Sequence, residues 1–215
     1  MFKFYALAVV AAVGIGNAHA ATFDFSAAAT GNSVGANLGG FETFSGIKTN
    51  GITVTAGALG EENNGDFFVD SFNGTIRQFS DGIGVRRNRN DNTNQVDGSG
   101  PDEGIRFFFS APVEIESIDF TRVDGNDEVT VLIDEAGGPV SFTQVASDLT
   151  IGTNDDSIQF IGSLLVDRVI LAALDGNDNW TVSAINIAHV PAPGAAILFA
   201  SALGLAGVYR RRAAV

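Results

Sequence analysis

Residues 104–131, GIRFFFSAPVEIESIDFTRVDGNDEVTV, decide the fold class of this chain. Their apolar residues lie in the short runs Gly104–Ser110, Val113–Phe120 and Val129–Ile133, and no run keeps the helical spacing of apolar residues. The sequence DGND separates the last two runs, and Asp, Gly and Asn are residues that tight turns favour. The stretch therefore predicts three β-strands, with a turn before the third.

Similar short runs recur along the rest of the chain, separated by Gly, Asn and Asp. They predict further strands at Thr22–Ser26, Ile52–Ala56, Asp66–Phe72, Val140–Thr143, Ile158–Ile161, Asp167–Ala172 and Trp180–Ile187. About ten strands in one domain of this size suit an all-β fold, an antiparallel jelly-roll-like β-sandwich. The residues predicted for its core are Phe107, Phe109, Ile118, Phe120, Val131, Ile133, Phe160, Ile170, Trp180 and Val182.

A polar stretch, RRNRNDNTNQVDGSGPDE, occupies residues 86–103. It has no apolar periodicity and is too long for a simple hairpin, so it predicts an exposed loop. Loops of this length are usually either functional or disordered, and the sequence leaves both interpretations open.

The DGND turn occurs twice, in VDGNDEVTV at residues 123–131 and in LDGNDNWTV at residues 174–182. In each case an apolar run precedes the turn and a Thr-Val run follows it, which predicts two equivalent hairpins. The four acids could serve turn chemistry alone. They could also form a calcium site, because turns that present carboxylate oxygens suit this ion. The four acids are Asp124, Asp127, Asp175 and Asp178, and the spacing is not that of an EF-hand loop.

Composition excludes several classes of function. The chain has no cysteine and two histidines, His19 and His189, so it offers no thiolate zinc site, no disulfide and little material for a histidine triad. Twelve Lys and Arg stand against 25 Asp and Glu, for a formal net charge of −13, which disfavours nucleic acid as a partner. The sequence predicts no enzyme, and calcium is the only cofactor it suggests.

The N-terminus has the three parts of a secretory signal peptide. Lys3 supplies the positive charge, Phe4–Ile15 is almost entirely apolar, and Ala18 and Ala20 fit the small residues that signal peptidase requires. We expect cleavage between Ala20 and Ala21, which gives a signal peptide of residues 1–20. A retained membrane anchor is the alternative, but the apolar run is short for a membrane span.

The C-terminus combines three features in a fixed order. The prolines of Val190, Pro191, Ala192 and Pro193 come first, the uncharged run Gly194–Tyr209 follows, and Arg210, Arg211 and Arg212 come last. Two prolines separated by one residue keep the backbone extended. The apolar run predicts a single transmembrane helix, with the arginines on the cytoplasmic side. An ordinary C-terminal anchor after a proline-containing linker is the alternative interpretation.

This tail, residues 190–215, resembles the PEP-CTERM sorting signal of Gram-negative bacteria that produce exopolysaccharide, in its V-P-x-P variant. Ala192 stands where the commonest form of the motif has Glu. The resemblance implies that an exosortase in the inner membrane recognises the tail and cuts near the prolines. It implies export through the inner membrane, anchoring by the C-terminal helix before processing, and then a place on the cell surface or in the extracellular matrix.

The predicted organisation is therefore a signal peptide (1–20), a β-sandwich domain (21–189) and a sorting tail (190–215). Three functions are compatible with it. We prefer an exported surface or matrix protein associated with exopolysaccharide or biofilm. The second is a lectin-like carbohydrate-binding module, which requires an exposed aromatic side chain. The third is a glycoside hydrolase, for which Glu103, Glu114, Glu116 or Glu128 could supply the two carboxylates.

Overall fold

One long strand organises the fold in the computed structural model, which describes residues 21–46, 51–60, 74–87, 94–99, 102–135, 142–151, 156–160 and 165–188. The two runs predicted as separate strands form a single strand, β7 (Glu103–Thr121). It bends where the break was predicted, because residues 109–112 lie opposite Asp167 alone in the neighbouring β11 (Leu165–Ala173). Pro112 lies in this bend, and proline has no N–H group to donate to a ladder of hydrogen bonds.

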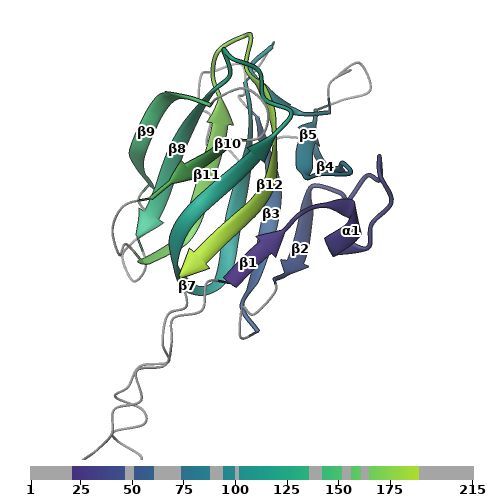
Figure 1. Cartoon of the computed structure of the whole chain (residues 1–215), viewed down its shortest axis with the longest axis vertical. Coiled ribbons are helices and arrows are strands. Elements are labelled where there is room, and N and C mark those ends of the chain that lie inside the picture. The colour runs from purple at the N-terminus through teal and green to yellow at the C-terminus, as the bar shows by residue number, and fades with distance from the viewer. Residues whose placement is uncertain are drawn as a thin grey trace, which may run out of the picture. The chain divides into compact units, whose positions relative to one another are not determined.

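The bend lets β7 serve both halves of one 12-stranded sheet, counted over the described residues. Its first part pairs with β3 (Thr53–Gly60) and β11, and its last part pairs with β10 (Asp156–Gln159) and β12 (Asn179–Ala188). Every described strand pair is antiparallel, so the predicted all-β antiparallel class is confirmed. The other elements in Figure 1 are β1 (Ala21–Asp24), α1 (Ala27–Thr30), β2 (Phe41–Ser45), β4 (Thr75–Gln78), β5 (Ile83–Arg86), β6 (Val96–Asp97), β8 (Glu128–Glu135) and β9 (Phe142–Thr150).

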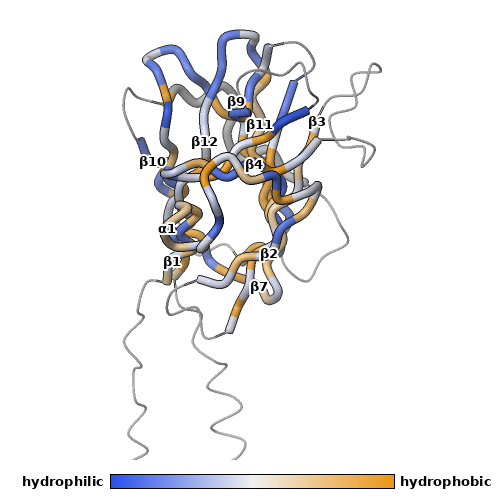
Figure 2. Tube along the Cα trace, turned by 90° about the vertical axis from the view of Figure 1, so that its right-hand side faces the viewer, coloured by the Kyte–Doolittle hydropathy of each residue, from blue (hydrophilic) through white to orange (hydrophobic). Residues whose placement is uncertain are grey.

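Phenylalanine side chains from the two halves of the sheet meet in the core. Phe107 of β7 stacks on Phe25, which follows β1, with ring centroids 5.5 Å apart, and Phe109 lies 6.0 Å from Phe23. Burying each of these rings contributes about 1.5–3 kcal/mol to the stability of the fold. Figure 2 shows the corresponding segregation, with hydrophilic segments concentrated in the connections at the top of the view.

All the predicted core residues are buried except Phe160. Phe160 is only partly buried, against the edge of the main cluster. Ile170 belongs to a second, smaller cluster with Leu59, Leu132 and Ala172, on the opposite side of the sheet from the main core. β11 therefore has buried apolar residues on both of its faces.

Short strands are the elements that the sequence pattern did not predict. These are β2, β4, β5 and β6, each of five residues or fewer. β6 also corrects the prediction of an exposed loop over residues 86–103, since it pairs with β12 and Val96 is fully buried. The predicted strand Asp66–Phe72 lies outside the described residues.

The first and last described strands lie side by side. β1 begins at Ala21, which is buried and pairs with Ile187 near the end of β12 (Figure 1). The predicted extent of the central domain, residues 21–189, stays a prediction. The other residues of the predicted cleavage site and sorting motif lie outside the described residues: Ala18, Ala20, Val190, Pro191, Ala192, Pro193, Arg210, Arg211 and Arg212.

Within the part of the chain that the structure describes, no helix has the length and apolar character needed to cross a membrane.

Candidate functional site

The two DGND turns are not hairpins, which corrects the prediction from the sequence. The first turn joins β7 to β8, and the second joins β11 to β12, but β11 separates β7 from β8 and β7 separates β11 from β12. The two strands that each turn connects are therefore not paired with each other, because another strand lies between them. Turn chemistry fixes the local change of direction, but it does not fix which strand the chain pairs with next.

Asp127 connects the two turns. Its Oδ2 accepts a hydrogen bond from the backbone N–H of Asp124 in its own turn, and its Oδ1 accepts one from the N–H of Asn179, at 2.9 Å, after the other turn. Both carboxylate oxygens are thus engaged by backbone N–H groups, and the side chain is fully buried.

Asp178 repeats this arrangement in the opposite direction. Its Oδ2 accepts from the N–H of Asp175 at 3.0 Å, and its Oδ1 accepts from the N–H of Glu128 at 2.9 Å. Burial raises the pKa of both Asp127 and Asp178 above the ordinary value, while the backbone hydrogen bonds act in the opposite direction. We call this pair of reciprocal bridges the aspartate clamp.

The structure brings the four predicted calcium ligands to one end of the domain, but it gives them different roles. Asp127 and Asp178 form the aspartate clamp, whereas Asp124 and Asp175 are exposed. Oδ1 of Asp124 accepts from the N–H of Asn126 at 3.2 Å. Among the described residues, no three His, Cys, Asp or Glu side chains are grouped in a way that could hold a metal ion. Calcium binding here stays a prediction.

A different surface carries the features expected of a ligand site. Phe41 of β2 is 59% exposed, and it is the only aromatic residue among the exposed large hydrophobic residues of the described chain. Its ring lies against the backbone of Gly57 in β3, where an added Cβ would be 2.6 Å from the ring. Glycine at this position therefore leaves room for the aromatic ring to pack closely against β3.

Two arginines and a second phenylalanine extend this surface across the sheet. The guanidinium of Arg106 lies 5.9 Å from the ring centroid of Phe41 and 4.5 Å from that of Phe108. The guanidinium of Arg168 lies 5.6 Å from the Phe108 centroid, and its Nε lies 3.6 Å from Oδ2 of Asp134. We call this row of five residues the Phe41 face.

Strand alternation places the Phe41 face on the outside of the domain. Phe107 and Phe109 of β7 and Val169 of β11 point into the main core, so Arg106, Phe108 and Arg168 point away from it. Side chains held by cross-strand neighbours lose little freedom when a ligand binds. The sequence did not single out this face, because Phe41 lies in a short edge strand and its neighbours come from four segments.

The glutamates considered for glycoside hydrolysis are not alike in exposure. Glu103 is buried, and its Oε2 accepts from the backbone N–H of Asp97 at 3.4 Å. Glu116 is exposed, and Glu114 and Glu128 are half-buried. Glu103 and Glu114 pair with opposite ends of β11, at Ala173 and Leu165.

No protein-family model matches the chain, and no curated protein sequence is significantly similar to it. Solved structures show a distant likeness. The family 32 carbohydrate-binding module of Clostridium perfringens NanJ, in complex with galactose, is 12% identical, with 63% of this chain and 93% of that chain covered and a TM-score of 0.33.

Two further structures are similar at the same level. Chitosan-binding module 1 of a chitosanase/glucanase from a Paenibacillus species is 12% identical, with 64% of this chain and 93% of that chain covered and a TM-score of 0.33. A GH29 fucosidase of Ruminococcus gnavus in complex with fucose is 13% identical over 67% of this chain and 26% of its own, with a TM-score of 0.36. These scores are below 0.5, so the function proposed below rests on the residues of this chain.

Proposed function

We propose that this protein is a non-catalytic polysaccharide-binding domain that is displayed on the cell surface or in the extracellular matrix. The observation that carries the proposal is the exposed ring of Phe41, which packs against Gly57 beside the guanidinium of Arg106. A flat aromatic ring packs well against the C–H groups on one face of a sugar ring. Guanidinium N–H groups at its edge donate hydrogen bonds to sugar hydroxyls.

The Phe41 face suits a polymer better than a small isolated ligand. It is a row across β2, β3, β7, β11 and β8 on the outside of a sheet, so it presents an extended surface. Arg106 lies between two rings and Phe108 lies between two guanidiniums, and such stacked pairs hold one another in place. An extended chain of sugars would contact several of these groups at once.

Export and sorting form the second part of the proposal. Residues 1–20 would be removed by signal peptidase, and the tail at 190–215 would be read by an exosortase in the inner membrane. Support comes from the sequence of both ends, where Lys3 precedes one apolar run and three arginines follow the other. In a strain that lacks its exosortase, we expect a protein of higher mass that stays in the membrane fraction. Unchanged mass and location would reject the sorting proposal.

Polysaccharide binding is tested with purified full-length protein and the exopolysaccharide of the producing organism. We expect a saturable isotherm, and we expect Phe41→Ala to lower the affinity about tenfold through the loss of ring contact. Val34→Ala is the matched control, because Val34 is 63% exposed and lies outside the Phe41 face. Equal affinity of Phe41→Ala and wild type would reject the site. Repeating the isotherm with calcium and with chelator tests the predicted calcium dependence.

A further inference from the structure

The outer edge of β2 presents backbone groups that point away from its partner in the sheet. The carbonyl of Gly40 accepts a hydrogen bond from the N–H of Ala58 in β3 at 3.0 Å. In an antiparallel ladder such bonds recur at every second residue, so the even-numbered residues of β2 face β3. The N–H and C=O groups of Phe41, Thr43 and Ser45 therefore point to the outer edge. Among the described strands, β2 pairs with β3 alone.

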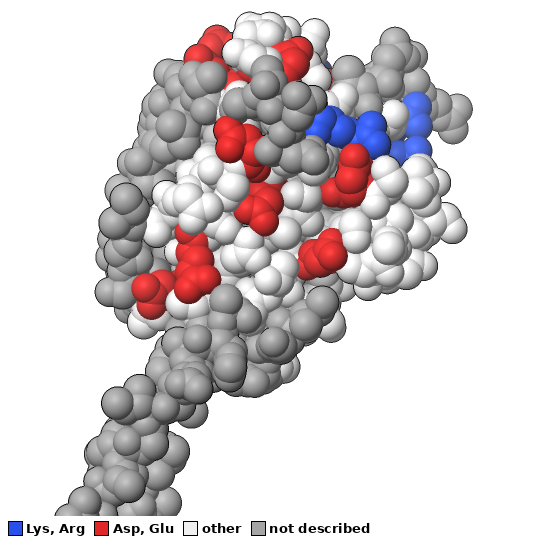
Figure 3. All heavy atoms as spheres, in the orientation of Figure 1, with Lys and Arg blue, Asp and Glu red and all other residues white. Residues whose placement is uncertain are grey.

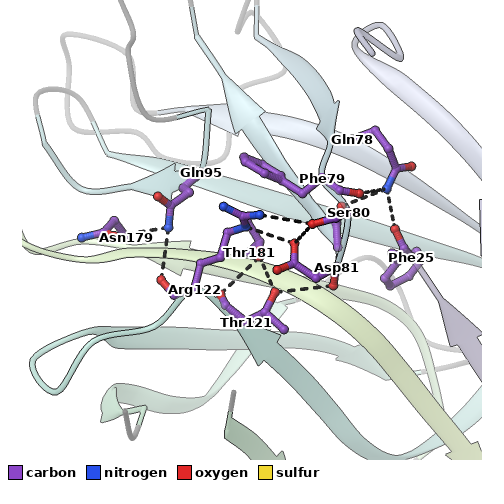
Figure 4. A network of polar contacts seen from close by, with 11 residues as sticks. Phe25, Gln78, Phe79, Ser80, Asp81, Gln95, Thr121, Arg122, Asn179 and Thr181 are labelled. Atoms are coloured by element: carbon purple, nitrogen blue, oxygen red, sulfur yellow. Dashed lines mark hydrogen bonds and ion pairs between the residues drawn. The ribbon is translucent and has the colours of Figure 1, made fainter. Parts of the chain in front are cut away.

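The chain is held in position directly before this edge begins. β4 pairs with the segment that precedes β2, where the N–H of Ile76 donates to the carbonyl of Gly39 at 2.7 Å. Gln78 fixes β4 in turn, since its Nε2 donates to the carbonyls of Phe25 and Phe79 at 2.7 and 2.9 Å (Figure 4). The start of β2 is therefore ordered before a partner arrives, which lowers the entropic cost of association.

The side chains of β2 leave its outer edge accessible. Phe41 is 59% exposed, and Thr43 and Ser45 are exposed as well. The Phe41 ring packs over Gly57 of β3, on the side of β2 away from this edge. β2 contains no lysine, arginine or proline, and its register with β3 has no bulge. These are devices by which proteins protect an edge strand from pairing with another chain.

The sequence of β2 is suited to pairing with a second copy of itself. In an antiparallel pair centred on Thr43, this residue lies opposite Thr43 of the second copy, and Phe41 lies opposite Ser45. Glu42 shares the inner side of β2 with the buried Phe44, and it lies opposite Phe44 of the second copy. A shift by two residues would instead place the two Glu42 carboxylates opposite each other, and such like-charged pairs are destabilising.

The charge of the chain favours contact at an edge over contact between broad faces. The formal net charge is −13, and Figure 3 shows acidic side chains spread over the face in view, with the basic side chains gathered at one side. Two acidic faces repel each other when they approach. Pairing at an edge places the faces of the two copies side by side, so these acidic faces are not brought together.

We propose that this protein forms a two-fold symmetric dimer by antiparallel pairing of β2 with β2 of a second copy. The symmetry axis passes between the two Thr43 residues, perpendicular to the sheet, so the sheet continues from one copy to the other. The outer faces stay on the same side, and the two Phe41 faces become one surface. The two Phe41 residues lie about 14 Å apart along the strands, which is four residues at about 3.4 Å each.

The short length of β2 sets the expected strength of the dimer. A stable interface uses about 20–30 residues a side, whereas β2 has five. We therefore expect a weak dimer, with a Kd on the order of 0.1 mM in sedimentation velocity. A polymer that contacts both Phe41 faces would hold the two copies together more tightly. This last consequence rests on the proposed polysaccharide binding, but the pairing itself does not.

Cysteine cross-linking of full-length protein without polysaccharide tests the pairing and its register. The chain has no cysteine, so each variant carries a single thiol. In the proposed pair the two Cα atoms of residue 43 are about 5.5 Å apart, which suits a disulfide. We expect Thr43→Cys to form a covalent dimer under mild oxidation. Ser45→Cys is the matched control, because it is exposed on the same edge but its two copies lie about 14 Å apart.

The ratio of the two cross-linking rates decides the proposal. We expect Thr43→Cys to cross-link at least about tenfold faster than Ser45→Cys, since only the former meets the distance limit for a disulfide. Association through any other part of the chain would cross-link both variants alike. Equal rates, or no covalent dimer of Thr43→Cys, would overturn the proposal.

A charge at the symmetry axis tests the dimer without a covalent bond. Thr43→Lys places two positive charges opposite each other, so we expect the dimer to disappear in sedimentation velocity. Val34→Lys adds the same charge at a position that is 63% exposed and outside β2, and it should dimerise like wild type. Thermal unfolding shows whether Thr43→Lys is folded. A folded Thr43→Lys variant that dimerises like wild type would overturn the proposal, whereas a dimer that binds no polysaccharide would reject only the function proposed above.

Discussion

The aspartate clamp and the Phe41 face both join several strands, but the clamp is buried whereas the ring of Phe41 is exposed. Asp127 and Asp178 are 0% and 2% exposed, and all four of their carboxylate oxygens accept backbone N–H groups. Phe41 is 59% exposed. The conspicuous repeated motif is therefore used to hold the two connections together, whereas the inconspicuous edge strand presents the candidate binding surface.

The sharpest test of this difference is Asp127→Asn. Asparagine keeps the shape of the side chain but replaces one acceptor with an NH₂ group, which would face a backbone N–H. We expect a loss of about 2–4 kcal/mol in the free energy of unfolding, because a buried N–H group loses its acceptor. Urea denaturation measures the loss. Asp124→Asn, at an exposed position, should change stability by less than about 0.5 kcal/mol.

The pH dependence of stability tests the clamp without removing it. Because burial raises the pKa of Asp127 and Asp178, the folded state binds protons more readily than the unfolded chain. Their contribution to stability therefore increases as the pH falls from 7 towards the unfolded value of 3.8, and it is lost as the pH rises through the folded pKa. We expect the stability gap between wild type and Asp127→Asn to widen over this range in urea titrations. A gap that narrows would show that the hydrogen bonds outweigh burial.

At the Phe41 face, Gly57→Ala should affect binding more than stability. The new Cβ would lie 2.6 Å from the Phe41 ring, so the ring must leave its position on the sheet. We expect the affinity for polysaccharide to fall by about fivefold to tenfold, with a change in stability below about 1 kcal/mol. Gly40→Ala is the matched control, since its nearest neighbour would be a backbone oxygen at 3.6 Å. Similar affinities for the two variants would contradict the role of the Phe41 ring packed against Gly57.

The sequence predicted what depends on local pattern. The two runs before the first DGND turn predicted the inward pairs Phe107 and Phe109, and Ile118 and Phe120, because alternate residues within each run share one face. The sequence did not predict that β7 continues through Pro112, since the bend depends on the pairing with β11. The sequence pattern could not predict the aspartate clamp either. Its partners Asp127 and Asn179 are far apart in the sequence and meet only because the connections cross to non-adjacent strands.

The candidate binding surface was harder to predict than the core. Phe41 lies in the short edge strand FETFS, which has too few apolar residues to stand out, and Gly57 has a meaning only when it is paired with Phe41. Arg106 and Arg168 carry no motif, because their positions beside Phe108 follow from the register of β7 and β11. Sites built from cross-strand neighbours depend on register, and register is set by the whole sheet.

The smallest expected effect concerns the far end of the Phe41 face, where Asp134 holds Arg168. The distance of 3.6 Å between Nε and Oδ2 indicates a weak ion pair, in which Arg168 is partly exposed and Asp134 is buried. Asp134→Asn keeps the size of this buried side chain, and we expect a change in stability of about 1–2 kcal/mol. It should lower the affinity for neutral polysaccharide only about twofold, because Arg168 loses an anchor but keeps its stacking on Phe108. A loss of affinity as large as that of Phe41→Ala would show that the binding site is centred on Arg168 and not on the exposed ring of Phe41.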